Sequence, residues 1–109
     1  MYSVGLVVDS NGVMAVEMDI TATGLMSKLG VLSLYIEEKV NGTWQEYDTV
    51  YGVLHPDFYD YNTYSYLGEY EFNGVSGRQY RVTMTAYARN SNGYDTGSVM
   101  STVVTCHNP

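Results

Sequence analysis

The sequence of 109 residues has little cysteine, proline or positive charge, and these shortages limit what the chain can do. Cys106 is the only cysteine, so no disulfide can form within the chain. Five lysines and arginines stand against twelve acidic residues, and the resulting net charge of −7 repels phosphate backbones and argues against a nucleic-acid partner. No apolar run approaches the roughly 18 residues of a membrane-spanning helix, so we expect no membrane insertion.

Tyrosine, valine and Asn-Gly pairs are abundant instead. Because 45% of the residues are apolar and 16% are charged, the chain can bury a core, and its length predicts a single domain over residues 1–109. Twelve tyrosines and fourteen valines, against two isoleucines and seven leucines, favour strands over helices. Asn-Gly pairs are typical of tight hairpin turns, and they begin at Asn11, Asn41, Asn73 and Asn92.

The clearest strand lies in the middle of the segment 70–97. Its apolar residues alternate strictly with polar ones, as a half-buried strand requires. Tyr80, Val82, Met84, Ala86 and Ala88 share one face, and Arg81, Thr83, Thr85, Tyr87 and Arg89 share the other. We predict that this is the central strand of the fold, with the first set buried and the second exposed.

The same alternation and the turn signals predict six further strands, at 2–8, 13–20, 31–40, 43–51, 64–72 and 96–105. The expected inward residues include Leu6, Met14, Val16 and Leu32. Residues 21–30 and 52–63 lack this alternation and are predicted to be loops, and Gly68 is the expected site of a bulge. The fold class predicted is therefore an all-β, seven-stranded antiparallel β-sandwich.

Two segments resemble fibronectin type III domains and the related immunoglobulin-like modules of bacterial secreted and surface proteins. They are Leu32 to Trp44, which contains Leu-Ser-Leu-Tyr-Ile-Glu-Glu-Lys, and Val75 to Gly97, which contains Gly-Arg-Gln-Tyr-Arg-Val-Thr-Met-Thr-Ala. The resemblance implies structural roles for Trp44 and for Tyr80, whose hydroxyl would bond to backbone a few residues upstream. The leucine that the family has six places before this tyrosine is Gly74 here.

The resemblance also implies that the third and sixth strands are antiparallel neighbours. Glu37 would then lie near Arg81, and Ser33 near Tyr87. It implies no catalytic residues, because such domains are mostly spacers and binding platforms.

Aromatic residues are densest between positions 47 and 70. Tyrosine presents a flat apolar ring and a hydroxyl at small entropic cost, which suits the recognition of sugars or protein surfaces. The alternative is that half of these rings pack under the 52–63 loop and the rest decorate an exposed strand. The candidate binding residues are Tyr51, Phe58, Tyr59, Tyr61, Tyr64 and Tyr66.

The chain carries no recognisable metal or catalytic motif. The acidic turn residues near Asp9 and Asp57 lack the ligand order of a calcium loop, and they are better explained as turn formers. His55, His107 and Cys106 are too few and too scattered for zinc, and the last two lie at a chain end that is expected to fray. Adjacent strand residues such as Glu37 and Glu38 point to opposite faces and cannot form an acid/base pair. We predict no metal, no cofactor and no enzymatic activity.

Together these observations predict a non-enzymatic module that is secreted or displayed at a cell surface and has a structural or protein-binding role. The alternative is a carbohydrate-binding module that uses the tyrosine-rich region around 51–70. The expected partner is a protein or a glycan, and the oligomeric state is left open.

Overall fold

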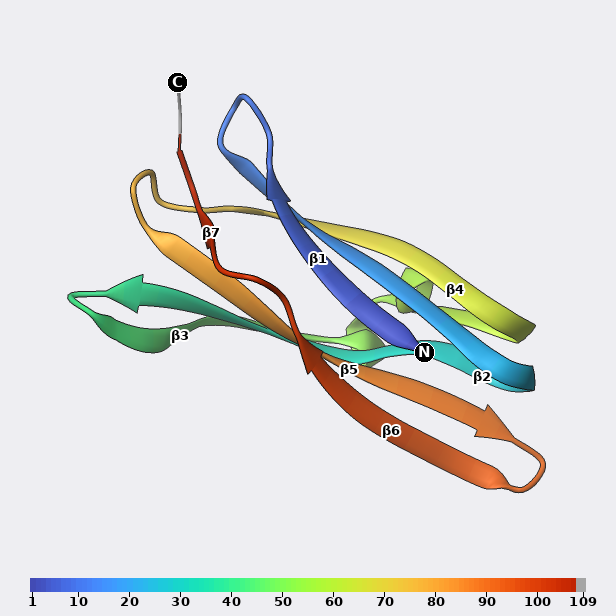
Figure 1. Cartoon of the computed structure of the whole chain (residues 1–109). Helices are drawn as coiled ribbons and strands as arrows, with labels where there is room; N and C mark the ends of the chain where they lie inside the picture. The colour runs from blue at the N-terminus through green and yellow to red at the C-terminus, as the bar shows by residue number, and fades with distance from the viewer. Residues whose placement is uncertain (108–109) are drawn as a thin grey trace.

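The computed structural model describes residues 1–107, which form an all-β chain of seven strands with no α-helix (Figure 1). Two short 3-10 turns, η1 (Gly52–Leu54) and η2 (Pro56–Phe58), join the third and fourth strands. The strands are β1 (Tyr2–Val8), β2 (Val13–Val40), β3 (Thr43–Tyr51), β4 (Tyr59–Asn73), β5 (Gln79–Asn90), β6 (Gly93–Met100) and β7 (Val104–Thr105). All pairings between them are antiparallel.

The strand β2 organises the sheet, because its 28 residues pair with β1, β3, β4 and β5. Its first part, 13–21, lies between β1 and β4. Its second part pairs with β5 over 28–39 and with β3 over 33–40. The sheet therefore has a first half, β1–β2–β4, and a second half, β3–β2–β5–β6, both built on β2. The start of β4 follows β2 into the second half, where residues 59–63 pair with residues 26–30.

A bulge bends β2 between these two halves. Four of its residues, 22–25, lie opposite Tyr64 alone, because Thr21 pairs with Ser65 and Met26 with Thr63. Figure 1 shows β2 reaching one end of the molecule, bending sharply there and returning, with β4 bent beside it. The predicted loop at 21–30 is thus wrong. Extra residues in one strand of a pair are accommodated as a bulge that bends the strand without ending it.

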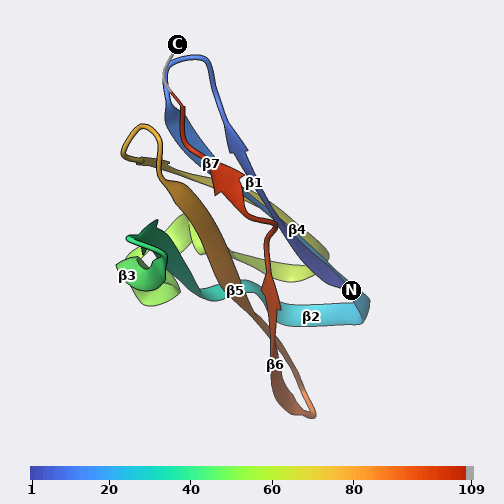
Figure 2. The same cartoon turned by 60° about the vertical axis from the view of Figure 1, so that its left-hand side comes forward.

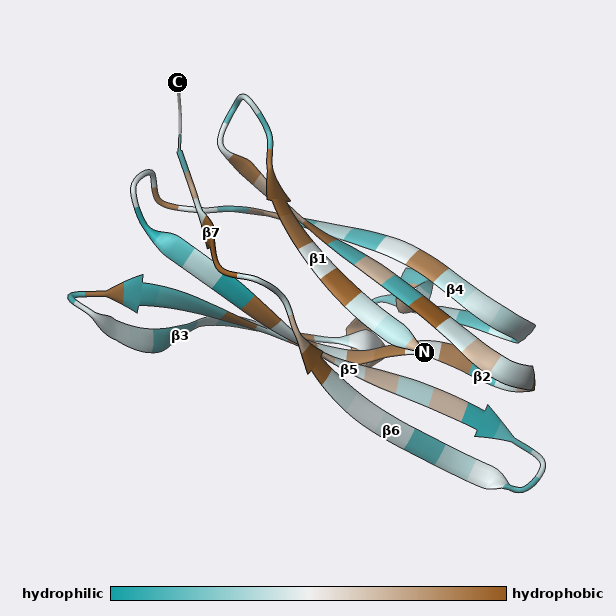
Figure 3. Ribbon diagram, in the orientation of Figure 1, coloured by the Kyte–Doolittle hydropathy of each residue, from teal (hydrophilic) through white to brown (hydrophobic). Residues whose placement is uncertain are grey.

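The curled sheet encloses one core, to which both halves contribute. Buried side chains come from the first half at Leu6, Met14 and Val16, and from the second at Leu34 and Val82. Figure 3 shows the corresponding hydrophobic bands alternating with polar ones along β2 and β5. In the turned view of Figure 2, the β5–β6 hairpin and the β1–β2 turn lie at opposite ends of the molecule. The molecule is elongated, with principal extents of 47 × 26 × 23 Å.

Tyr80 is fully buried, and its hydroxyl accepts a hydrogen bond from the backbone N–H of Val75 at 2.6 Å. This confirms the expected bond to upstream backbone. The same hydroxyl donates to Glu38 Oε2 at 2.5 Å, and Arg78 Nη1 donates to Glu38 Oε1 at 3.0 Å. Gly74 leaves room for this arrangement, because a Cβ there would lie 2.9 Å from Tyr80 Cε2 and 3.0 Å from Cys106 Sγ.

The pairing of the third and sixth predicted strands is confirmed as the pairing of β2 with β5. Arg81 Nε donates to Glu37 Oε1 at 2.9 Å, as expected. However, Ser33 lies opposite Thr85 and not Tyr87, because the register is unbroken from Ser33 to Lys39, and pairing Glu37 with Arg81 places Ser33, four residues earlier, opposite Thr85.

The β2–β5 register shifts between Val31 and Ser33, at Leu32. This irregularity leaves Leu32 41% exposed, so its predicted inward position is wrong.

Three further local features differ from the prediction. The 52–63 segment is shorter as a loop, since β4 already begins at Tyr59. The register passes through Gly68 without a shift, so no bulge occurs there. The last predicted strand is divided into β6 and β7, because Ser101 leaves the ladder and its hydroxyl accepts from the backbone N–H of Val82 at 3.0 Å.

Candidate functional site

The structure separates the predicted binding residues into exposed and buried groups. Tyr51, Tyr61 and Tyr64 are 54%, 60% and 61% exposed. Tyr59 is half-buried, whereas Phe58 and Tyr66 belong to the core at 0% and 2% exposure. The last two therefore cannot contact a ligand in the folded chain, and we remove them from the candidate site.

Phe58 and Tyr66 are buried for identifiable reasons. The ring of Phe58 stacks on His55 at 4.9 Å and meets Tyr70 edge-on at 6.0 Å. The Tyr66 hydroxyl donates to the backbone carbonyl of Asp57 at 2.9 Å. Burial, together with the nearby negative charges of Asp57 and Asp60, raises the pKa of Tyr66 to about 12. The alternative expectation is that half of the aromatic set packs under the 52–63 segment; Tyr66 packs against that segment, whereas Phe58 belongs to it.

Tyr59 and Tyr61 of β4 join residues from β2, β5 and β6 in one surface group. Where β4 and β5 flank β2, the register places Tyr59 beside Gly30 and Tyr87, and Tyr61 beside Lys28. Residues opposite each other in an antiparallel pair point to the same face. We call Lys28, Tyr59, Tyr61, Tyr87 and Tyr94 the tyrosine cluster.

Lys28 lies among the rings of this cluster. Its Nζ is 4.2 Å from the centroid of Tyr59, 5.8 Å from that of Tyr87 and 6.0 Å from that of Tyr61. These distances are within the range of cation–π attraction. Burial, and secondarily its neighbours Tyr87 and Tyr61, raises the pKa of Tyr59.

The rings also contact one another. Tyr59 and Tyr87 meet edge-on at 6.2 Å, and Tyr87 stacks on Tyr94 at 5.8 Å with 24° between the ring planes. Tyr94 is 72% exposed, so the cluster ends in an accessible ring on β6. Each contact of this kind contributes about 0.5–1.5 kcal/mol, which orders the rings before any partner binds.

Gly30 allows β2 and β4 to approach closely beneath the cluster. A Cβ at this position would overlap the backbone carbonyl oxygen of Phe58, and it would lie 2.8 Å from Tyr59 Cα. The close approach sets Tyr59 next to Tyr87 on the outer surface. The glycine is therefore required by contact with backbone, since its φ is not positive.

Sequence reasoning missed three members of the cluster: Lys28, Tyr87 and Tyr94. Tyr87 was expected on the outer face of its strand, which the structure confirms. No pattern near Lys28 could place it, because the 21–30 segment was interpreted as a loop. Tyr94 lay within a predicted turn, although β6 already begins at Gly93.

The other two exposed candidates lie outside the cluster. Tyr51 lies opposite Ser33 on the same outer face. Tyr64 lies opposite the β2 bulge and, among the residues described, has no ring contact with another aromatic side chain or with a cation.

Trp44, for which a structural role is predicted, is half-buried and lies outside the core. Arg81 Cζ lies 4.2 Å from the centroid of its ring, and Lys39 Nζ lies 5.8 Å from it. Arg81 is in turn bound to Glu37. Arg81, held by Glu37, and Lys39 therefore both lie against the tryptophan ring.

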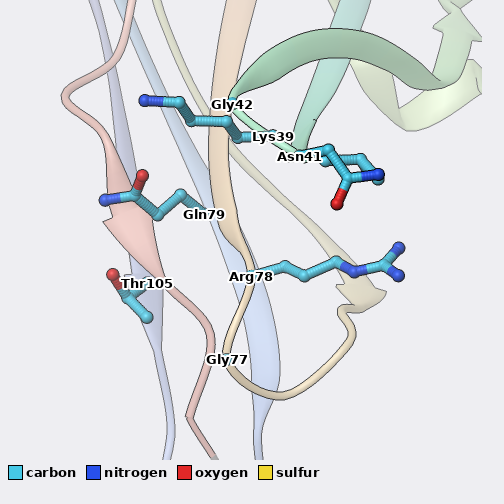
Figure 4. Close-up of a pocket in the computed structure, with 8 residues that line it drawn as sticks. Lys39, Asn41, Gly42, Gly77, Arg78, Gln79 and Thr105 are labelled. Carbon is cyan, nitrogen blue, oxygen red and sulfur yellow. The ribbon is translucent and has the colours of Figure 1, made fainter.

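A polar cleft of about 480 Å³ lies between the β2–β3 turn and the segment before β5 (Figure 4). Figure 4 shows that Lys39 and Gln79 extend to one side of it, whereas Asn41 and Arg78 extend to the other. These side chains do not converge on a common point. The cleft therefore lacks the geometry of a catalytic site.

The remaining polar candidates have local structural contacts. Asp9 Oδ1 accepts hydrogen bonds from the backbone N–H groups of Asn11 and Val13, at 2.8 and 3.0 Å. Within residues 1–107 no group of three or more His, Cys, Asp or Glu side chains is placed to hold a metal ion.

The end of the described chain is anchored, contrary to the expectation that Cys106 frays. Cys106 is fully buried, and its backbone N–H donates to the carbonyl of Arg78 at 2.8 Å. His107 is exposed. No helix among residues 1–107 is long and apolar enough to cross a membrane.

Comparison of the chain with protein-family models, with curated proteins and with solved structures gave no match. Its function is therefore inferred from the arrangement of its own residues.

Proposed function

We propose that this chain is a non-enzymatic, immunoglobulin-like β-sandwich module, secreted or displayed at a bacterial cell surface, that binds a protein or a glycan. The shared core between the β1–β2–β4 and β3–β2–β5–β6 halves of the sheet supports the sandwich. The hydrogen bond between Val75 N–H and the Tyr80 hydroxyl supports the immunoglobulin-like assignment. These features make the chain a rigid scaffold for a binding surface.

The observation that carries a binding role is the tyrosine cluster. Tyrosine is enriched at recognition surfaces because its ring buries a large area and its hydroxyl remains hydrogen-bonded. Tyr61 and Tyr94 are mostly exposed, yet both lie within ring or cation contacts that restrict their motion. A preordered aromatic surface loses less conformational entropy when it binds.

A glycan is the second candidate partner, and the chemistry of the cluster favours it. Protein interfaces have an apolar centre from which charged residues are depleted. The tyrosine cluster instead has Lys28 at its centre, with Tyr59 and Tyr87 around it. Aromatic rings interspersed with a hydrogen-bond donor suit a hydroxylated ligand better than an apolar one.

The test compares three tyrosine-to-alanine variants on a glycan array and on an array of purified secreted and cell-surface proteins. Tyr61→Ala and Tyr94→Ala are expected to weaken binding about tenfold or more, because each removes an exposed aromatic anchor. Tyr64→Ala is the matched control, since Tyr64 and Tyr61 are 61% and 60% exposed on the same strand.

The proposal would be refuted if the Tyr61→Ala/Tyr94→Ala double variant bound every ligand of the wild-type chain with unchanged affinity. Unfolding curves of all variants show whether a loss of binding reflects a loss of fold.

A further inference from the structure

Two cations lie directly opposite each other at the centre of the tyrosine cluster. The β2–β5 register pairs Lys28 with Arg89. Side chains at directly opposite positions have Cβ atoms about 4.5–5.5 Å apart, and like charges at such positions are destabilising. The chain has only five lysines and arginines, so this pairing does not follow from an excess of positive charge.

Nothing in the described structure neutralises this pair. Neither Lys28 nor Arg89 has a carboxylate oxygen within 4.0 Å among residues 1–107, where the ion pairs are Arg78–Glu38 and Arg81–Glu37. The acidic residues nearest in register, Asp60 and Asp95, lie opposite Leu29 and Ala88. They therefore point to the other side of the sheet.

The two cations are flanked by rings across four adjacent strands. The register aligns Tyr61 of β4, Lys28 of β2, Arg89 of β5 and Tyr94 of β6 in one row. At about 4.8 Å between strands, this row is roughly 14 Å long. The next row contains Tyr59, Gly30, Tyr87 and Thr96. Lys28 is held in position by the Tyr59 ring, and its ammonium group remains without a counter-charge.

We propose that the tyrosine cluster, extended by Arg89, binds an acidic glycan. The carboxylate or sulfate of the sugar would accept hydrogen bonds from Lys28 and Arg89, and sugar rings would lie against Tyr61 and Tyr94. The proposal rests on the proposed binding function and specifies its ligand class. A ligand anion placed between the two cations would offset their repulsion through charge-assisted hydrogen bonds to both.

The experiment measures binding of oligogalacturonate by isothermal titration calorimetry, with its fully methyl-esterified form as the uncharged control. Sialylated and sulfated oligosaccharides extend the acidic panel. We expect at least one acidic probe to bind at least tenfold more tightly than the methyl ester at 50 mM salt. That preference should shrink at 300 mM salt, because exposed charges are screened.

Lys28→Gln and Arg89→Gln are each expected to weaken binding of the acidic probe about tenfold or more, since each removes a charge-assisted hydrogen bond. Lys39→Gln is the control: Lys39 is also without an ion pair in the described structure, but it lies near Trp44 at the far end of β2. Arg89→Gln should be at least as stable to urea as the wild-type chain, because it relieves the repulsion and leaves the contacts between Lys28 and the tyrosine rings in place. A purely structural role of Arg89 would instead make this variant less stable.

Each alternative outcome has a defined meaning. Equal affinity for the acidic probe and its methyl ester overturns the charge preference while the proposed binding function stands. Tighter binding of poly-glutamate than of any acidic sugar overturns the glycan class and identifies an acidic peptide as the partner. Failure of all three acidic sugars to bind overturns the inference, whereas the proposed function is judged separately by the array experiment.

Discussion

Replacing Tyr80 with phenylalanine tests whether the hydroxyl of this buried residue fixes the start of β5. The substitution keeps the ring, which packs edge-on against Tyr47 at 5.3 Å and Phe72 at 5.6 Å. It removes the donor to Glu38 Oε2 and the acceptor for Val75 N–H. Only the polar contacts are therefore lost.

The expected loss follows from these two bonds. A hydrogen bond to a charged group contributes about 1.5–3 kcal/mol, and Glu38 is only 8% exposed, so water cannot fully replace the hydroxyl. The bond from the Val75 N–H is neutral and only partly buried, so its loss contributes less than the loss of the bond to Glu38. We expect Tyr80→Phe to lower the free energy of unfolding by about 2–3 kcal/mol.

Tyr66→Phe provides the matched comparison. Tyr66 is 2% exposed, but its hydroxyl donates to a neutral backbone carbonyl, so the expected loss is about 1 kcal/mol. Urea unfolding followed by the fluorescence of Trp44, the only tryptophan, measures both values. If Tyr80→Phe is no more destabilising than Tyr66→Phe, the bond to the charged Glu38 stabilises the fold no more than a neutral hydrogen bond does.

Three further predictions concern the backbone, the cysteine and the tyrosine hydroxyls. Gly30→Ala should lower the thermal midpoint of unfolding by several degrees, because the new Cβ would overlap the Phe58 carbonyl. Gly24→Ala is the control and should leave the midpoint unchanged, because no atom lies within 4 Å of its Cβ. Equal midpoints for the two variants would contradict the close approach of β2 and β4. Cys106 is fully buried, so the thiol reagent DTNB should label it only in urea-unfolded chain, and rapid labelling of native chain would show that the terminus is loose. Burial raises the pKa of Tyr66 from its ordinary value of 10.0 to about 12, and burial with the bond to Glu38 raises that of Tyr80 as well. Above pH 10, the folded chain therefore keeps phenol protons that the unfolded chain loses. The free energy of unfolding should fall as the pH rises from about 10 to 12. A constant free energy of unfolding in urea titrations across this range would refute the prediction.

Strict alternation made the central strand predictable. Tyr80, Val82 and Met84 are fully buried, as their spacing required, and Arg81 reaches Glu37 across the predicted strand pair. Alternation is a local signal, and it is strong wherever one face of a strand is buried.

Long-range contacts decided the segments that were mispredicted. Gly24 and Gly30 resemble loop residues in the sequence, but the first lies in a bulge and the second accommodates the backbone of β4. Nothing near Gly30 in the sequence indicates that the backbone of Phe58 will lie in contact with it. The continuity of β2 between residues 21 and 30 depends on partners in β4 that are distant in the sequence, which local patterns cannot identify.

The candidate site was predictable in its chemistry and only partly in its membership. High tyrosine density drew attention to Tyr59 and Tyr61, which the structure places in the tyrosine cluster. Burial of Tyr66 could not be foreseen, because neighbouring residues of one strand differ only in the face to which they point. Lys28 was missed because its position depends on the register of β2 with both β4 and β5.

The shared strand has a mechanical consequence. Since β2 belongs to both halves of the sheet, tension applied to one half passes along a continuous covalent backbone into the other. The bulge at 22–25 and the tyrosine cluster around Lys28 are neighbours on this strand. A ligand that binds across β4, β2, β5 and β6 would therefore stabilise the bend in β2. The ligand-bound chain should resist mechanical unfolding and proteolysis better than the free chain.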